Sequence, residues 1–252
     1  MSKATMNNGI VNVEKVTFNK DGNIKLGNMW SWNTLKGNNL IHINYNGIEF
    51  DCVGSCGKMC ETCGCTEKCY VNKSYNRYPS VKYGHAVNTL AMRTSMRKVF
   101  TDLYNQLANA KKKPEFVRIH SSGEFESIDE IRLFNFLAYH FPEVRFYTYS
   151  KNFDLWDKFL SENAIQSNFI LNVSIWHESG IDFFRKWRFM DNIKAFVYDD
   201  GFDYASAGLI INSHCKAYDK KGKMNHAITC DKCKKCMRYN NNYKVVACYD
   251  HS

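Results

Sequence analysis

The stretch from residue 115 to residue 150 reads EFVRIHSSGEFESIDEIRLFNFLAYHFPEVRFYTYS. Its residues 116–120 form a short apolar run that predicts a buried strand. Ser127 and Glu130 then have the spacing of a capping box, which predicts a helix over 127–140. Residues 144–149 predict the next strand. A strand–helix–strand unit of this kind is typical of a parallel sheet, because parallel strands need a crossover connection.

The same alternation continues on both sides of this unit. It predicts a strand over 47–52, a long helix over 81–110, strands over 169–175, 193–198 and 207–212, and helices over 153–163 and 182–191. Five or six such units are too few for an eight-unit barrel, so the sequence predicts an α/β fold built as an open or partial (β/α) barrel. Functional groups are then expected in the loops at the C-terminal strand ends.

Composition divides the chain into three segments. Residues 1–47 are rich in Asn and Gly and predict short strands and turns. Residues 48–212 are the predicted partial barrel and contain a Cys-rich loop. Residues 213–252 are rich in Lys, Cys and Asn and show almost no apolar periodicity, so we expect a bound metal to hold this C-terminal extension together.

The whole-chain composition limits the class of protein. Of 252 residues, 44% are hydrophobic and 15% aromatic, which argues against global disorder. The chain starts with polar residues and contains no apolar run near the ~20 residues of a membrane helix. We therefore predict a cytoplasmic protein without a membrane partner. The net charge of +9 permits contact with nucleic acid, although solvated lysine-rich loops are the simpler explanation.

Cysteines provide the strongest chemical signal. There are 11 of them, an odd number, and ten lie in two tight groups in a chain without a signal peptide, which favours metal binding over disulfides. Six lie between Cys52 and Cys69. The candidate ligands among them are Cys56, Cys60, Cys63, Cys65 and Cys69.

Two overlapping triads compete within this first group. Cys56, Cys60 and Cys63 form C-x3-C-x2-C, which can hold three corners of a 4Fe–4S cluster and leave the fourth iron open to a substrate or cofactor. Cys60, Cys65 and Cys69 form C-x4-C-x3-C. A zinc knuckle made of four of these thiolates is the alternative.

The second group has four candidate ligands and a C-x2-C-x2-C core: Cys215, Cys230, Cys233 and Cys236. A site closed by four thiolates is structural or transfers electrons, and it predicts a second iron–sulfur cluster or a tetrahedral zinc. Lys232, Lys234 and Lys235 would offset its negative charge. Cys248 stands alone near the end of the chain.

The turn His120-Ser-Ser-Gly-Glu-Phe125 follows a predicted strand. Gly123 permits a tight turn, after which Glu124 can point its carboxylate into the mouth of the barrel. A plain strand–helix turn with a solvated Glu124 is the alternative. His120 is a second candidate catalytic residue, although a lone His is more often structural. The aromatic run Phe146–Tyr149, followed by Lys151, is another candidate, with buried sheet aromatics as the simpler reading.

The cysteine loop and this turn resemble the radical S-adenosylmethionine enzymes, in which a Gly-Gly-Glu motif follows the second strand. The resemblance implies a barrel of that family's type, S-adenosylmethionine as cofactor, a reductant such as flavodoxin or ferredoxin, and cofactor contacts from Ser121, Ser122, Gly123, Glu124, Ser174 and Tyr70. Two positions depart from the pattern. Thr62 replaces an aromatic residue common before the third cysteine, and Ser122 replaces a glycine.

A closer resemblance is to the phage "gene product 88" domain family, whose role is poorly known. It covers about residues 45–237 and is carried by Cys69-Tyr70, Tyr78–Val81, Arg118–Phe125, Tyr147–Lys151 and the terminal Cys-x2-Cys-x2-Cys. It implies that the protein acts in the cytoplasm of a phage host, and it favours the ligand set that ends at Cys69.

Three functions remain open. The leading one is a radical S-adenosylmethionine-like enzyme with a C-terminal auxiliary cluster, acting on an unidentified small-molecule or macromolecular substrate. The second is a non-enzymatic zinc or iron–sulfur module that contacts nucleic acid through its lysines. The third keeps the fold and the cluster but has lost cofactor binding.

Overall fold

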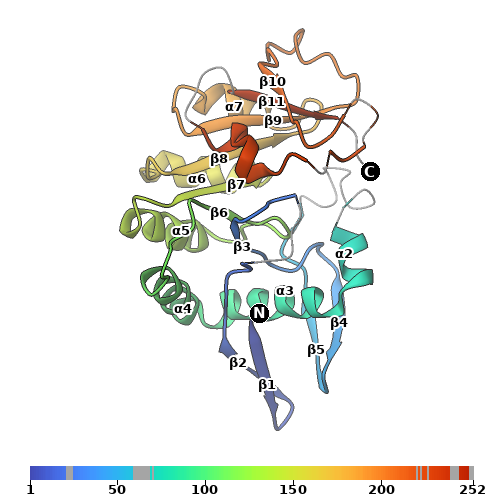
Figure 1. The fold of residues 1–252 in the computed structure, drawn as a ribbon, viewed down its shortest axis with the longest axis vertical. Helices are drawn as coiled ribbons and strands as arrows, with labels where there is room; N and C mark the ends of the chain where they lie inside the picture. The colour runs from blue at the N-terminus through green and yellow to red at the C-terminus, as the bar shows by residue number, and fades with distance from the viewer. Residues whose placement is uncertain are drawn as a thin grey trace.

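A single parallel sheet organises the computed structural model, which describes residues 1–20, 25–58, 69, 71–219, 221, 223–225, 227–238 and 244–249 (Figure 1). Within these residues the sheet has seven strands in the order β10-β11-β9-β8-β7-β6-β3, and every neighbouring pair is parallel. The strands are β3 (Trp30–Trp32), β6 (Phe116–Ile119), β7 (Arg145–Ser150), β8 (Phe169–Ile175), β9 (Ile193–Asp199), β10 (Ser213–His214) and β11 (Val245–Tyr249).

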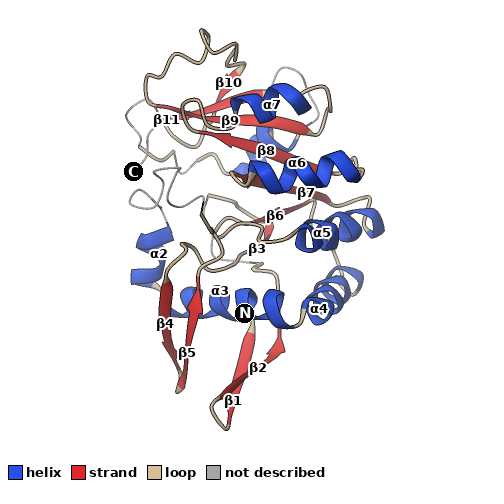
Figure 2. Cartoon of the chain, turned by 180° about the vertical axis from the view of Figure 1, so that it is seen from behind, coloured by secondary structure: helices blue, strands red, loops and turns tan. Residues whose placement is uncertain are grey.

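Helices connect successive strands in the middle of the sheet. These are α5 (Ile128–His140), α6 (Phe153–Glu162) and α7 (Ile181–Trp187). They lie side by side on the same face of the sheet, together with α4 (Met96–Ala108) (Figure 2). Crossover helices are what parallel neighbours require.

Two antiparallel hairpins lie outside this sheet. They consist of β1 (Lys3–Asn7) with β2 (Ile10–Lys15), and β4 (Leu40–Tyr45) with β5 (Ile48–Val53). The helices α2 (Val71–Arg77) and α3 (Pro79–Thr94) follow the second hairpin. The C-terminal segment contributes one helical turn, α8 (Cys230–Cys233), and a short 3-10 helix over Lys235–Met237. No helix in the described ranges is long and apolar enough to cross a membrane.

The two faces of the sheet differ in chemistry because side chains alternate along each strand. The face toward the helices is apolar and includes Val117, Phe146, Leu171, Ala195 and Ala247. The opposite face is mixed, with apolar side chains such as Phe196 and Val246 beside polar, charged and sulfur-containing ones. From the same strands it presents Arg118, Tyr147, Tyr149, Ser174, Tyr198 and Cys248. Among the described residues, the helix side therefore holds the main apolar cluster, and the other side carries a smaller cluster together with the cavity lining.

The sequence predicted most of the central sheet. Strands over 116–120, 144–149, 169–175 and 193–198 are confirmed as β6 to β9, and helices over 127–140, 153–163 and 182–191 are confirmed as α5 to α7. The α/β class with a parallel sheet is confirmed as well. In the described residues the sheet is open, with β3 and β10 as its two edges.

Two predicted elements are wrong, and a third has another partner. The strand predicted over 47–52 is confirmed as β5, but it pairs with β4 and not with the parallel sheet, whose first strand is the much shorter β3. The helix expected over 81–110 divides at Ser95, whose ψ of 47° is not helical. Residues 207–212 form no strand; β11 pairs with β9 instead. As a result, the sheet takes strands from all three predicted segments of the chain.

Candidate functional site

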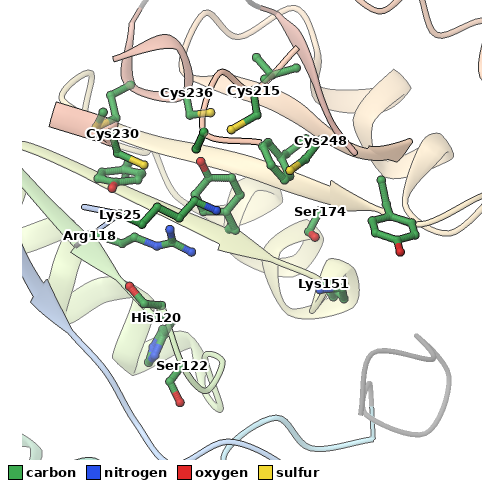
Figure 3. A pocket seen from close by; sticks show the side chains of 18 of the residues that line it. Lys25, Arg118, His120, Ser122, Lys151, Ser174, Cys215, Cys230, Cys236 and Cys248 are labelled. Carbon is green, nitrogen blue, oxygen red and sulfur yellow. The ribbon is translucent and has the colours of Figure 1, made fainter. Parts of the chain in front are cut away.

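A cavity of about 250 Å³ opens at the carboxyl ends of the parallel strands. Its lining includes the turn after β6, Lys151 after β7, Ser174 near the end of β8, and Tyr198 near the end of β9. Residues from both cysteine groups also line it. In Figure 3, Cys215, Cys236 and Cys248 lie on one side of the cavity, and His120 and Ser122 lie on the other.

Cys56 and Cys69 represent the first cysteine group in this lining. The backbone N–H of Gly37 donates to the Cys56 sulfur at 3.2 Å, and the Cys56 N–H donates to the Gly37 carbonyl at 2.9 Å. A backbone donor to sulfur stabilises a thiolate and is a common means of tuning metal–thiolate centres. The predicted ligands Cys60, Cys63 and Cys65, and the predicted cofactor contact Tyr70, lie outside the described residues.

The turn after β6 is tightly joined to the loop that precedes Cys56. Gly123 has a φ of +81°, and a Cβ placed there would lie 2.0 Å from Thr34 Oγ1 and 2.4 Å from Ser55 Oγ. Ser55 Oγ accepts the Glu124 N–H at 3.1 Å. The sequence prediction of a tight glycine turn therefore has a steric reason, because only glycine fits between the turn and the loop.

Glu124 is buried, with 6% of its surface exposed. Its two carboxylate oxygens accept the backbone N–H groups of Phe125 at 3.0 Å and Lys151 at 2.8 Å. Burial raises the pKa of Glu124, although the His120 ring and the hydrogen bonds act in the opposite direction. The carboxyl group thus lines the cavity and also ties the end of β6 to the end of β7.

His120 is held on both sides of its ring. Nδ1 shares a hydrogen bond with Thr34 Oγ1 at 3.1 Å, and Nε2 pairs with Glu130 Oε1 at 3.1 Å. Its φ of +54° is unusual for a residue with a side chain. Because both ring nitrogens are engaged, these contacts favour a structural role over the predicted catalytic one.

The serines of the turn also reach the cavity. Ser122 Oγ shares a hydrogen bond with the Tyr75 hydroxyl at 3.2 Å, and this hydroxyl contacts His85 Nδ1 at 2.9 Å. Ser121 lines the cavity beside Ser122, and Ser174 does so from β8. The structure therefore brings together all the described residues that were predicted to contact a cofactor.

The second cysteine group forms the opposite wall, where all four predicted ligands line the cavity: Cys215, Cys230, Cys233 and Cys236. Burial raises the pKa of Cys236 to about 12, and Tyr149 is hydrogen-bonded to this thiol. Cys248 lies in the same wall and shares a hydrogen bond with Cys215. Within the described ranges, no three His, Cys, Asp or Glu side chains converge closely enough to hold a single metal ion.

The described lining is strongly basic. It contains six Lys and Arg residues, against one carboxylate, Glu124; the six are Lys25, Lys36, Arg118, Lys151, Lys234 and Lys235. Arg118 stacks on the Tyr149 ring at 4.5 Å. Burial lowers the pKa of Lys25, whereas Tyr218 and three nearby cysteines raise it by a larger amount, so the net shift is upward. A cavity with this charge suits anionic contents.

Aromatic side chains complete the lining. Trp176 and Tyr198 stack with ring centroids 4.4 Å apart and planes within 5°. In the aromatic run of β7, Tyr147 and Tyr149 line the cavity, whereas Phe146 packs in the helix-side core. The sequence analysis gave Lys25, Arg118 and Cys248 no place in the site. Lys25 and Cys248 come from segments without a motif of their own, and in the motif Arg118–Phe125 only the turn after the strand was assigned a role. The one available signal was the apolar run around Cys248, which is typical of a buried strand.

A family model described as "Gene product 88" matches residues 16–242 of the chain. Neither a curated protein nor a solved structure gives a match.

Proposed function

The chain belongs to the gene product 88 family, and we propose that it is an iron–sulfur enzyme of the radical S-adenosylmethionine-like type, built on a partial (β/α) barrel. One observation supports this most directly. Two cysteine groups that are far apart in sequence line the same cavity as the Ser122–Glu124 turn, at the carboxyl ends of parallel strands. This is the end of an α/β sheet where ligands bind.

The partial barrel is supported by the distribution of helices. In a (β/α) barrel the helices form the outer ring around the strands. Here α5, α6 and α7 lie on one face of the sheet (Figure 2), and the side chains of the other face line the cavity. An open sheet that curves around a cavity leaves more room for a cofactor and a substrate than a small closed barrel, whose interior is filled by side chains.

The first cysteine group would hold an open cluster. Its three thiolate donors would come from one of the two overlapping triads, Cys56, Cys60 and Cys63 or Cys60, Cys65 and Cys69, and the Gly37 N–H donated to Cys56 favours an ionised sulfur there. When bound, such a cluster and S-adenosylmethionine supply one-electron chemistry, whereas the protein supplies binding, orientation and electrostatics. Ser122, Glu124 and Ser174 would orient the cofactor beside the cluster.

The second group would hold an auxiliary centre in the opposite wall. The described side chains there do not converge on a single ion. We propose an iron–sulfur cluster rather than zinc because Cys-x2-Cys-x2-Cys runs occur in ferredoxin-type cluster loops. The cations of the lining would offset the charge of the thiolates, among them Lys25, Arg118 and Lys235. A closed centre of this kind transfers electrons or stabilises the wall.

The test is anaerobic purification with iron and sulfide counting, followed by incubation with dithionite and S-adenosylmethionine. We expect bound iron and sulfide and the release of 5′-deoxyadenosine. A variant with Cys56, Cys60 and Cys63 replaced by Ala should lose this release. Cys52→Ala is the matched control, because Cys52 packs in an apolar cluster away from the cavity and should keep it.

Two outcomes would contradict the proposal. A fully loaded cluster without cofactor cleavage would favour a protein that has lost cofactor binding. Zinc without iron, together with nucleic-acid binding that weakens steeply with salt, would favour the non-enzymatic module. A flavodoxin or ferredoxin that replaces dithionite would identify the reductant class.

A further inference from the structure

A row of rings in mutual contact crosses the surface of α4 and α5; its members are Phe100, Tyr104, Phe136, Tyr139 and His140. The ring centroids of Phe100 and Phe136 lie 5.5 Å apart, as do those of Tyr104 and His140. Tyr139 contacts Phe136 at 6.2 Å and His140 at 5.3 Å. Because the same step along both helices joins the two cross-helix pairs, α4 and α5 run parallel and carry this aromatic row along one shared face. Both helices lie side by side at the edge of the molecule (Figures 1 and 2).

Two rings of the aromatic row face solvent. Phe136 is 50% exposed and Tyr139 is 62% exposed, and their ring planes are within 20° of each other. On the same helix, Phe134 and Leu137 pack in the core. Isolated exposed apolar side chains are normal, whereas a contiguous exposed group marks a contact site. The row is therefore a candidate binding surface.

The charge left over around this row is positive. The carboxylates of α4 and α5 already have partners in the protein: Asp102 with Lys98 at 3.1 Å, Asp129 with Arg132 at 3.0 Å, and the buried Glu130 with His120 at 3.1 Å. Three exposed cations have no carboxylate partner within the described part of the chain, namely Arg97, Lys111 and Lys112. Such a surface attracts a polyanion.

These three cations lie at the two ends of the aromatic row. Arg97 is in the first turn of α4, three residues before Phe100 and thus on the same side of the helix. Lys111 and Lys112 follow the end of α4, and the ion pair of Lys113 with Glu143 at 3.2 Å holds this segment beside the residues that follow α5. Because α4 has 13 residues, the cations flank a row about 20 Å long.

We propose that the α4–α5 face binds single-stranded nucleic acid. Its bases stack on the exposed rings of Phe136 and Tyr139, and its phosphates contact the cations at the two ends of the row. Aromatic platforms beside basic side chains are the combination that single strands require, because every base has a π-face and every nucleotide a negative charge. A duplex offers only the charge, since its bases are stacked on one another.

Other partners match this surface less well. A second copy of the chain would cover the rings but leave the three cations uncompensated, and an acidic peptide would pair with the cations but leave the rings exposed. The surface lies on the helix side of the sheet, whereas the cavity lies on the other side. It is also distinct from the lysines of residues 213–252. The inference therefore goes beyond the proposed function and does not depend on it.

The test measures binding of the full chain by fluorescence anisotropy, with labelled oligothymidylate and oligouridylate as the DNA and RNA arms and a duplex of equal length. We expect the single strands to bind more tightly than the duplex, and the tighter arm identifies the nucleic acid. A double variant, Phe136→Ala with Tyr139→Ala, should weaken single-strand binding about tenfold or more. Tyr78→Ala with Phe189→Ala is the matched control, because these rings are 48% and 75% exposed but lie outside the row.

Salt dependence separates the phosphate contacts from the stacking. For single strands, the slope of log K against log salt changes by about 0.7 for each phosphate neutralised. Replacing Arg97, Lys111 and Lys112 by Gln should therefore make the slope less steep by about 2, whereas the aromatic variant should keep it. Gln at Lys3, Lys15 and Lys73 is the control, since these exposed lysines lie on other segments. Circular dichroism checks that every variant is folded.

Three results would overturn the inference. One is no binding of either single strand at low salt, and another is an equal loss in the row variants and their matched controls. The third is a dimer of the wild type in sedimentation that the Phe136 and Tyr139 variant lacks, with no nucleic acid bound, because the row would then join two copies of the chain. Neither anisotropy nor sedimentation depends on a cluster, so each of these results leaves the iron–sulfur proposal as it stands.

Discussion

Gly123 lies where the turn after β6 comes closest to the loop that leads to Cys56. An alanine there would adopt the left-handed φ of +81° and place its Cβ 2.0 Å from Thr34 Oγ1. Strain and overpacking together should lower the free energy of unfolding by about 2–4 kcal/mol, measured by urea denaturation of Gly123→Ala. Gly9→Ala is the control, because Gly9 has a φ of +75° with nothing within 4 Å. Equal losses in the two variants would contradict the steric argument.

His85 should make the fold sensitive to acid. Burial, and then the nearby His120 ring, lowers the pKa of His85 from 6.5 to about 3. The unfolded chain therefore binds more protons between these values. The contribution of His85 to stability is complete above pH 6.5 and is lost as the pH falls toward about 3, by up to about 1.4 kcal/mol per pH unit.

Urea unfolding of the wild type and of His85→Asn across this range checks the effect. The variant should show a flatter dependence on pH, because the buried imidazole is gone. His140→Asn is the matched control, since His140 is exposed at the end of α5. A wild-type slope in His85→Asn would show that other groups govern the acid transition.

The residues of the turn were predictable, but their partners were not. The spacing of Gly123 and Glu124 after a strand follows from local sequence. Glu130 reaches Nε2 of His120 from the helix that follows β6, but the contact of Thr34 with Nδ1 depends on β3 lying next to β6, which no local pattern contains. The hydrogen bonds that hold the His120 ring therefore come in part from a tertiary contact, which local sequence does not reveal.

At the level of elements, the N-terminus of α5 has a defined cap. Ser127 Oγ accepts the Glu130 N–H at 3.2 Å, as the capping-box spacing predicts. Ser127→Ala should lower the free energy of unfolding by about 1 kcal/mol. Ser161→Ala is the control within α6, where the hydroxyl is exposed and donates to the Asp157 carbonyl, so its effect should stay within about 0.5 kcal/mol. Thermal or urea denaturation distinguishes the two, and equal effects would exclude a capping role.

Elements were predictable where the apolar pattern was long. The strands β6 to β9 and the helices between them have clear periodicity, whereas β3 has three residues within an Asn- and Gly-rich segment. Ser95 ends one helix and begins another without a proline or glycine, so the apolar pattern over 81–110 continues through the break. The apolar periodicity of a sequence indicates which face of a helix is buried, but it does not indicate where the helix axis changes direction.

At the scale of the whole molecule, the C-terminal segment is part of the main sheet. A chain that ends at residue 243 lacks β11, so β9 loses a neighbour and the core loses Val245 and Ala247. We expect this truncated chain to lose cooperative unfolding and near-ultraviolet circular dichroism, compared with the full chain. A truncated chain that unfolds like the full one would show that β11 is not part of the cooperative unit.

The cavity as a whole could be foreseen only in part. The cysteine spacings and the turn were visible in the sequence, but nothing local indicates that the two cysteine groups line one cavity. That convergence depends on strand order, because β11 lies next to β9 and brings the C-terminal wall over the same strand ends as the turn. Strand order is set by the packing of the complete chain.

The place of β11 also bears on how the protein is made. Ribosomes release a chain from its N-terminus onward, and domains fold as their parts emerge. Because an interior strand spans residues 245–249, β9 keeps a bare hydrogen-bonding edge until the last of these residues has left the exit tunnel. The sulfur-bearing wall is therefore completed only after β6 to β9 have emerged, because β11 is made after all four of them.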